Sequence, residues 1–265
     1  MNYGLILAGG VGQRMRRTGM PKQFLEVFGK PIIIYTLQKF EYCEDIDEVV
    51  IACHSSWKDY MESMLQRYGI KKVKAVISGG KDRQDSVLNG LKYIQSNGAS
   101  DKDVVVIHDG VRPFISYDTI TDNINCVREK GNAITCTSCF ETIIISEDGE
   151  NIDTVPYRKT TYSAQAPQSF YLNDILAAHD EIRALPTRYE NMVDSCTIMM
   201  TLGKKVNMIQ GNRGNIKVTT PEDVYMFRAL LQYQENEQAF GLGLTGKNKA
   251  IIERALRNKM KAGRV

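Results

Sequence analysis

The chain has 265 residues, of which 43% are hydrophobic and 25% charged, so a globular protein with a sizeable core is expected. Its net charge of +3 comes from lysines and arginines spread along the chain, and this argues against a nucleic-acid-binding protein. No apolar run reaches the roughly 20 residues that span a bilayer, and no secretory signal is recognisable. We therefore expect a cytoplasmic protein without stable membrane insertion.

Short apolar runs alternate with segments of helical length in the first half of the chain. Buried strands are expected at residues 3–8, 48–53, 74–78 and 103–109. Helices are expected at residues 31–40, 56–68, 85–95 and 117–130. Strands that alternate with helices in this way predict an α/β fold with a mostly parallel sheet.

The pattern changes at about residue 133. Residues of about 133–165 read as strand-rich, and "EDGE" is suited to a hairpin turn, so we expect a protruding β-arm. A helix at about 172–185 and a strand near 206–210 should follow. A further helix opens at "TTPEDV", with Thr220 as N-cap and Pro221 at its first position.

The chain is expected to divide into a main domain, residues 1–233, and a C-terminal extension of unknown role, residues 234–265. The extension begins with a polar, glycine-containing link and continues as the basic amphipathic segment "KNKAIIERALRNKMKAGR". Such a segment is typical of a solvated helix, and contact with a membrane surface or a partner is the alternative.

A glycine-rich stretch, "LAGGVGQRM", follows the first strand. Gly10 and Gly12 are not followed by the third glycine of a dinucleotide-binding turn, and the Gly-Lys-Ser/Thr ending of a P-loop is absent. Glycine N–H groups can face phosphate oxygens, and the loop continues through three arginines and Lys22. We expect it to wrap a triphosphate, the alternative being a glycine-rich turn with solvated arginines.

Asp109 ends a predicted strand, at the edge of a parallel sheet where ligands bind. A carboxylate facing a triphosphate can hold Mg²⁺, which favours one or two carboxylates plus phosphate oxygens. His108 could act as a base, although a packed, hydrogen-bonded histidine is the preferred interpretation. Ser86, after Gly79 and Gly80, is either an N-cap or first-turn residue of a helix or a hydroxyl that reads a base.

The six cysteines are expected to be reduced, because a chain of this size does not need disulfides to fold. Cys136 and Cys139 form a C-x-x-C pair, but they lie in a strand-like segment without a second pair at zinc spacing. A metal or redox role for this pair is therefore not favoured.

Five motifs, in the same order, resemble those of the cytidylyltransferases that make CDP-activated polyols. They are "LAGGVGQRM…MPKQFL…GKPI", "GGKDRQDSV", "HDGVRPF", "APQSF" and "NIKVTTPEDV", and they span residues 3 to about 231. The family includes 2-C-methyl-D-erythritol 4-phosphate cytidylyltransferase and ribitol-5-phosphate cytidylyltransferase. The resemblance implies a nucleotidyltransferase with a three-layer, Rossmann-like fold, which uses CTP, a polyol phosphate and Mg²⁺. It also implies a homodimer that exchanges the β-arm.

The resemblance assigns roles to individual residues. Arg14 and Lys22 would stabilise the charge on the α-phosphate of CTP, and Arg158 and Lys217 would orient the attacking phosphate. Asp109 would lie beside Mg²⁺ and the reacting phosphates. The other nucleotide-binding residues would be Leu7, Ala8, Gly9, Gly10, Gly12, Gly80, Lys81, Asp82, Arg83, Gln84, Asp85, Ser86 and Gly110. The other substrate-binding residues would be Arg112, Thr142 and Asp194.

The identity of the polyol depends on weaker signals. Ala166 stands where the family usually has the threonine of Thr-Pro-Gln, so a substrate-side hydroxyl is missing. The stretches "KFEYCEDIDEVVIACHSSWKDYM" and "VPYRKTTYSAQAPQSF" look more like the ribitol enzymes, which favours D-ribitol 5-phosphate as substrate and CDP-ribitol as product. The alternative substrate is 2-C-methyl-D-erythritol 4-phosphate, for isoprenoid precursor synthesis. An inactive nucleotide-binding sensor is the alternative from another class, and it would not need the charged residues that are present.

Overall fold

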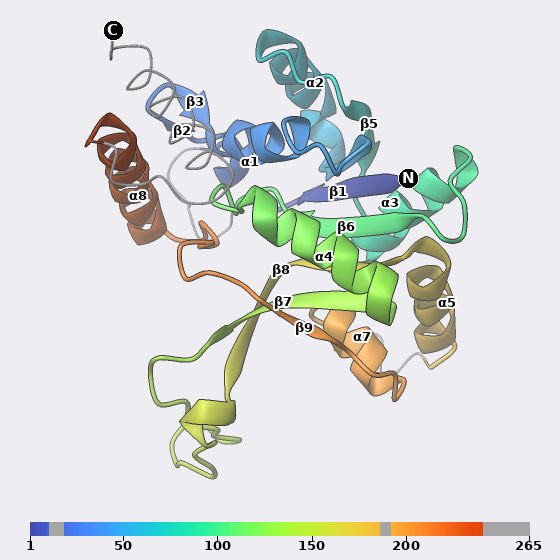
Figure 1. Ribbon diagram of the computed structural model, residues 1–265, viewed down its shortest axis with the longest axis vertical. Helices are drawn as coiled ribbons and strands as arrows, with labels where there is room; N and C mark the ends of the chain where they lie inside the picture. Colours follow the sequence, from blue (N-terminus) through green and yellow to red (C-terminus); the bar gives the residue numbers. More distant parts are fainter. Residues whose placement is uncertain (11–18, 186–191, 241–265) are drawn as a thin grey trace, which may run out of the picture. The chain divides into compact units, whose positions relative to one another are not determined.

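A computed structural model describes residues 1–10, 19–185 and 192–240, and divides the chain into units Met1–Thr220 and Pro221–Val265. The first unit contains a seven-stranded sheet, whose strands in spatial order are β5 (Val73–Ser78), β4 (Glu48–Cys53), β1 (Asn2–Ala8), β6 (Val104–Asp109), β8 (Tyr162–Tyr171), β7 (Asn132–Ser138) and β9 (Met208–Gln210) (Figure 1). Among these seven strands, β8 alone runs antiparallel to its neighbours. The expected mostly parallel sheet is confirmed.

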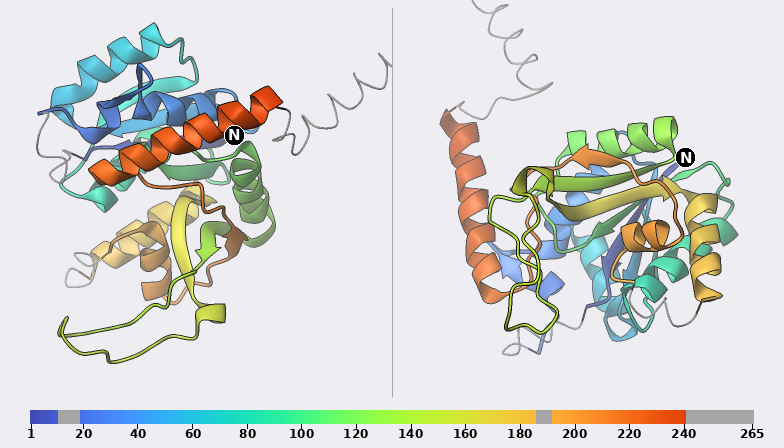
Figure 2. Two further views of the ribbon diagram at one scale, coloured as in Figure 1. Left: turned by 90° about the vertical axis from the view of Figure 1, so that its left-hand side faces the viewer. Right: turned by 90° about the horizontal axis from the view of Figure 1, so that it is seen from below.

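Helices cover both faces of this sheet (Figures 1 and 2). One face carries α1 (Ile32–Glu41), α2 (Lys58–Arg67) and α4 (Tyr117–Lys130), and the other carries α3 (Arg83–Ser96), α5 (Leu172–Arg183) and α7 (Ser195–Thr201). Alternate residues of β6 serve the two layers, since Val104 and Val106 pack in the first core and Val105 and Ile107 in the second. This burial of both faces explains why the strands read as continuous apolar runs.

Two helix predictions differ from the structure, and one helix was not predicted. The helix expected from residue 85 begins at Arg83, because Asp82 is its N-cap and accepts a hydrogen bond from the Asp85 N–H at 2.8 Å. The helix expected at 56–68 is divided into a 3-10 turn, Ser55–Trp57, and α2. Helix α7 was not predicted, since its seven residues are too few to show an apolar period.

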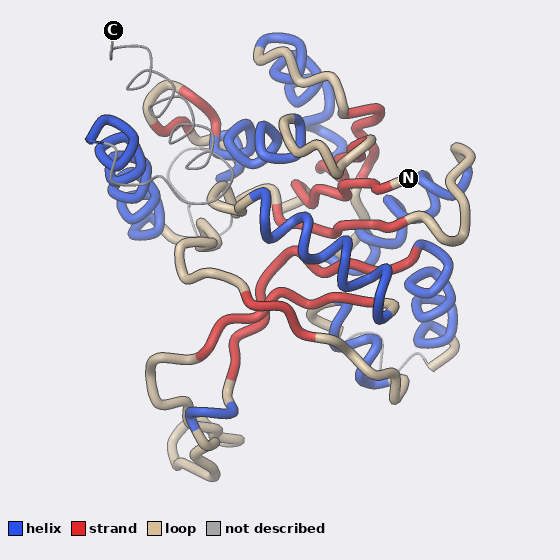
Figure 3. Tube along the Cα trace, viewed as in Figure 1, coloured by secondary structure: helices blue, strands red, loops and turns tan. Residues whose placement is uncertain are grey.

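Residues 139–161, between β7 and β8, form a projection that we call the arm (Figures 2 and 3). The predicted turn at "EDGE" is confirmed, because Gly149 has a φ of 77° and Asp148 accepts the N–H groups of Glu150 and Asn151 at 2.8 Å each. The strands expected on either side of the turn are reduced to one isolated bridge, between Ile145 and Thr154. The arm therefore has few backbone contacts of its own.

The second unit contains α8 (Pro221–Phe240), which begins at Pro221 as predicted. The first part of the polar link expected from about residue 234 is instead the last part of this helix, because "ENEQAF" consists mostly of good helix formers. The glycine-containing part of that link lies outside the described residues. The basic segment expected beyond it lies outside the described residues. No helix in the described part of the chain is both long and apolar enough to cross a membrane. A two-stranded pair, β2 (Glu26–Val27) and β3 (Lys30–Pro31), was also not predicted.

Candidate active site

The carboxyl ends of β1 and β6 meet at the centre of the sheet. Leu7 pairs in register with Asp109, and the N–H of Gly110 donates to the carbonyl of Leu7 at 2.9 Å. A Cβ on Gly110 would lie 3.1 Å from that carbonyl oxygen, so the close approach of the two strand ends favours glycine there. The structure thus brings the start of the glycine-rich loop next to Asp109, as the sequence predicted.

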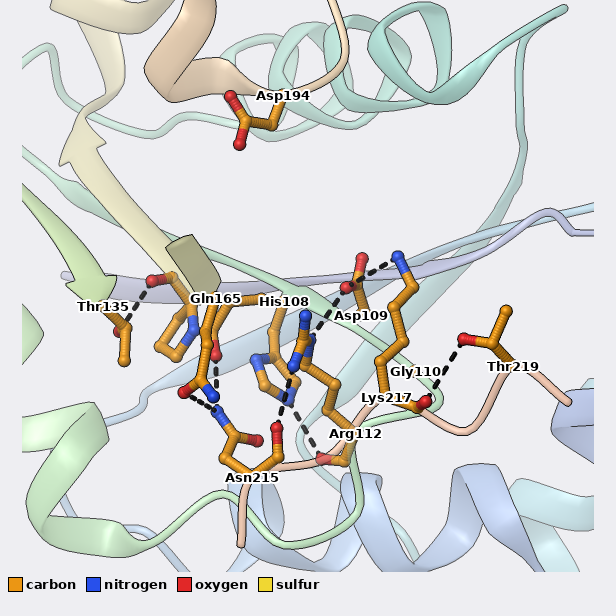
Figure 4. A network of polar contacts seen from close by, with 12 residues as sticks. His108, Asp109, Gly110, Arg112, Thr135, Gln165, Asp194, Asn215, Lys217 and Thr219 are labelled. Atoms are coloured by element: carbon orange, nitrogen blue, oxygen red, sulfur yellow. Dashed lines mark hydrogen bonds and ion pairs between the residues drawn. The ribbon is translucent and has the colours of Figure 1, made fainter. Parts of the chain in front are cut away.

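Three cationic side chains surround the Asp109 carboxylate. Its Oδ2 lies 3.1 Å from Nζ of Lys217 and 3.1 Å from Nε of Arg112 (Figure 4), and its Oδ1 lies 3.7 Å from Nη2 of Arg83. We call these four residues the Asp109 cluster. Arg83 lies in the first turn of α3, and Asp109 is the last residue of β6. Arg112 lies in the loop after β6, and Lys217 lies in the loop before α8.

The positive charges of the cluster determine the ionisation state of the Asp109 carboxyl group. Burial by itself would raise the pKa of Asp109, but the positive charges of Lys217, Arg83 and Arg112 outweigh it and hold that pKa well below its usual range. The carboxylate is therefore ionised at neutral pH. Three cations facing one carboxylate leave an excess of positive charge, which suits an anionic ligand.

The N-terminus of α3 lies beside the cluster. Ser86 Oγ accepts the Gly80 N–H at 3.0 Å and donates to the Asp82 carbonyl at 2.8 Å. A Cβ on Gly9 would lie 3.7 Å from the same hydroxyl, so the turns after β1 and β5 both approach Ser86. Ser86 is thus a buried residue in the first turn of α3, as one of the two interpretations had it, and its hydroxyl bonds to the turn after β5.

The remaining predicted nucleotide-binding residues of this segment have different surroundings. Lys81 is exposed, and Asp85 forms an ion pair with Arg183 of α5. Gln84 is 1% exposed, and neither polar atom of its side chain has a hydrogen-bond partner in the described part of the chain.

Lys22 is held near the end of β1 by its neighbours in sequence. It begins a short 3-10 turn, Lys22–Phe24, in which the buried Gln23 donates from Nε2 to the Ala8 carbonyl at 2.7 Å. Phe24 packs against Trp57 and Tyr60, with ring centroids 5.2 Å apart in each pair. Sequence reasoning missed Gln23, whose only signal was its place next to Lys22. Gly12 and Arg14 lie outside the described residues.

His108 is a packed, hydrogen-bonded residue, which confirms the interpretation preferred from the sequence. Its side chain is fully buried, Nε2 lies 3.2 Å from the Arg112 carbonyl, and the ring is 5.5 Å from that of Phe40. Burial lowers the pKa of His108 to about 4, so the imidazole is neutral at pH 7. Its hydrogen bond to the loop after β6 helps to place Arg112.

Three predicted substrate-side residues lie elsewhere. Thr142 and Arg158 are exposed on the arm, and among the described residues neither side chain has a hydrogen bond or ion pair. Asp194 stands apart from the Asp109 cluster in Figure 4 and is the N-cap of α7, where its carboxylate accepts from Thr197 N at 2.8 Å and from Gln168 Nε2 at 2.9 Å. One chain by itself therefore does not bring the whole predicted set together.

Comparison with known proteins finds relatives that match most of the chain. The family model of 2-C-methyl-D-erythritol 4-phosphate cytidylyltransferase, IspD, matches residues 3–233. A protein of Streptococcus agalactiae serotype III, named ribitol-5-phosphate cytidylyltransferase, is 45% identical over 242 residues, which are 91% of this chain and 100% of the relative. A protein of the same name from Vibrio parahaemolyticus is 44% identical over 241 residues, with the same coverage of both chains.

A solved structure supports the same assignment. The 4-diphosphocytidyl-2C-methyl-D-erythritol synthase of Anaerococcus prevotii superimposes with a TM-score of 0.74 at 29% sequence identity, over 87% of this chain and 96% of that one. The similarity therefore covers most of the α/β fold. The chain belongs to the IspD family of cytidylyltransferases and is a nucleotidyltransferase.

Proposed function

We propose that the protein transfers a cytidylyl group from CTP to D-ribitol 5-phosphate, giving CDP-ribitol and pyrophosphate. The observation that carries the proposal is the Asp109 cluster, in which three cations converge at the carboxyl ends of the central strands. The names of the two bacterial relatives at 45% and 44% identity favour ribitol 5-phosphate. The family description and the solved structure keep 2-C-methyl-D-erythritol 4-phosphate as the second candidate.

Charge neutralisation is the main demand of this reaction. A substrate phosphate must approach the α-phosphate of CTP, and its attacking oxygen is already ionised, so no protein base is required. His108 is consistent with a mechanism that lacks a base, because it is buried and its pKa of about 4 makes it a poor proton acceptor. A donor aimed at developing charge contributes about 3 kcal/mol, and Lys217, Arg112 and Lys22 are the candidates for this role.

We further propose Mg²⁺ as the cofactor, with Asp109 as its protein ligand. Among the described residues, no group of three or more His, Cys, Asp and Glu side chains could hold a metal ion. One carboxylate together with phosphate oxygens nevertheless meets the usual preference of Mg²⁺, so a nucleotide would supply most of the ligands. Bound Mg²⁺ would contribute charge neutralisation at the phosphates. Lys217 and Arg112 would then be available to phosphate oxygens.

We propose a homodimer in which the arm covers the partner's site. Several arm side chains are apolar and exposed, including Ile144 at 52%, Val155 at 55% and Tyr157 at 66%. An arm with so little internal pairing and so much apolar surface gains stability when a second copy covers it. In such a dimer Arg158 and Thr142 would complete the site of the partner. The six free cysteines are in keeping with a cytoplasmic location.

One assay tests the proposed function. CTP and Mg²⁺ are incubated with the protein and either ribitol 5-phosphate or 2-C-methyl-D-erythritol 4-phosphate, and pyrophosphate release is followed, with Lys217→Ala as control. We expect release with ribitol 5-phosphate and a CDP-ribitol product by mass spectrometry. Release with the methylerythritol substrate alone would select the second candidate. Release with neither, while calorimetry still detects CTP binding, would indicate a nucleotide sensor.

A further inference from the structure

Residues 211–217, which we call the linking segment, connect the base of the arm to the Asp109 cluster. At its first residue, the Gly211 N–H donates to the Cys136 carbonyl at 2.7 Å, at the point where β7 leads into the arm. At its last residue, Lys217 reaches Asp109. Between these two ends lies Asn215, whose side chain is 1% exposed.

The Asn215 side chain is attached to β8. Its Nδ2 donates to the Ala166 carbonyl at 2.7 Å and lies 3.4 Å from Gln165 Oε1 (Figure 4). A hydrogen bond in a buried setting fixes both partners, because breaking it leaves a buried donor and a buried acceptor unpaired. This contact therefore sets where the linking segment lies relative to the central sheet.

The Asn215 backbone faces the reaction site. Its carbonyl accepts from Arg112 Nη1 at 2.8 Å, while Arg112 Nε contacts the same Asp109 oxygen that Lys217 Nζ contacts (Figure 4). One residue beyond Lys217, the Val218 N–H donates to the Val111 carbonyl at 2.9 Å. Asn215 thus holds the carbonyl that accepts from Arg112, and it fixes the backbone close to Lys217.

We propose that Asn215 is a positioning residue for the transfer reaction, which through its attachment to β8 keeps Arg112 and Lys217 in place beside Asp109. This inference rests on the proposed function and names a residue that acts through these cations without contact with the reactants. A shift of the linking segment by about 1 Å would misplace both cations, and a displacement of that size costs on the order of a hundredfold in rate.

Thr135 provides a matched control for a purely structural role. It is fully buried, and its Oγ1 donates at 2.8 Å to the carbonyl of Pro167, the residue next to Ala166 (Figure 4). Both side chains therefore hold adjacent carbonyls of β8, but the Thr135 hydroxyl has no hydrogen bond to the linking segment. Asn212, an exposed residue of the linking segment, provides a second control.

The experiment compares Asn215→Ala, Asn215→Ser, Thr135→Val and Asn212→Ala for kcat, both KM values and the melting temperature. We expect Asn215→Ala to lower kcat by about tenfold or more while KM for CTP changes by less than about twofold. Asn215→Ser keeps a donor and should recover part of the loss. Thr135→Val should lower the melting temperature with little change in kcat, and Asn212→Ala should resemble the wild type.

A double-mutant cycle with Lys217→Ala tests whether Asn215 acts through Lys217. In that background Asn215→Ala should slow the reaction by a clearly smaller factor than in the wild type, because one of the two cations that it positions is already gone. Independent, multiplying effects would overturn the proposal, as would an Asn215→Ala variant whose kinetics match Thr135→Val.

Hydrogen exchange separates this inference from the proposed function, because it does not depend on activity. The Val218 amide should exchange faster in Asn215→Ala, or in Asn215→Ser if the alanine variant does not fold, than in Thr135→Val. Unchanged protection would overturn the positioning role even if the wild type proved inactive with both polyol phosphates. An active wild type with an unaffected Asn215→Ala variant would overturn this inference alone.

Discussion

Two buried histidines should make the fold sensitive to mild acid. His108 and His179 are fully buried, and burial lowers the pKa of each to about 4, from a usual value near 6.5. Between these two values the unfolded chain binds protons that the folded chain does not, so the free energy of unfolding rises with pH in this window. Acidification from pH 7 to pH 5 should therefore destabilise the protein.

The pKa shift fixes the size of the effect. A histidine whose pKa falls from 6.5 to about 4 destabilises the fold by about 2 kcal/mol at pH 5 and by about 0.2 kcal/mol at pH 7. The two histidines together should lower the free energy of unfolding by about 3.5 kcal/mol between these pH values. The depressed pKa of Asp109 acts only near and below pH 4, outside this window.

Urea denaturation at pH 7 and pH 5 measures this difference, with the fluorescence of Trp57 as the probe, because it is the single tryptophan and packs on Phe24. His108→Gln and His179→Gln should each remove about half of the pH dependence. A wild type that loses less than about 1 kcal/mol between the two pH values would refute the reasoning. So would a double variant that keeps the full dependence.

Three further predictions concern the site. Lys22→Ala, like Arg14→Ala, should lower kcat by on the order of a hundredfold with an unchanged melting curve, and an unchanged kcat would show that the loop does not contact the reacting phosphate. If Gly80–Ser86 reads cytosine through buried hydrogen bonds, ATP and GTP should be poor donors and UTP a weak one, because the larger ring would leave polar groups of the site unpaired. Equal turnover of all four nucleotides would limit Gly80–Ser86 to phosphate or ribose contacts. Mixed Lys22→Ala and Arg158→Ala chains should recover about a quarter of wild-type activity, because about half of the dimers contain one rebuilt site of two. No recovery on mixing would place Arg158 in its own subunit's site.

The sequence by itself determined the parts of the protein that depend on local pattern. Apolar runs such as "VVVIHD" indicated buried parallel strands, and their ends indicated where Asp109 and the glycine turns would lie. The motif resemblance identified the family and the charged residues, including Lys217. Short elements were missed, among them α7 and the pair β2 and β3, because a few residues show no period.

The tertiary structure decided which residues share the site and what holds them there. Arg112 Nη1 and the Asn215 carbonyl are 103 positions apart in sequence, and Arg83 and Lys217 reach the same carboxylate from different elements. The roles of Gln23, Asn215 and Asp194 likewise depend on carbonyls and amides that folding places within hydrogen-bond distance. The spacing of residues in the sequence does not predict such contacts, because they form only when separate strands and loops meet at one edge of the folded sheet.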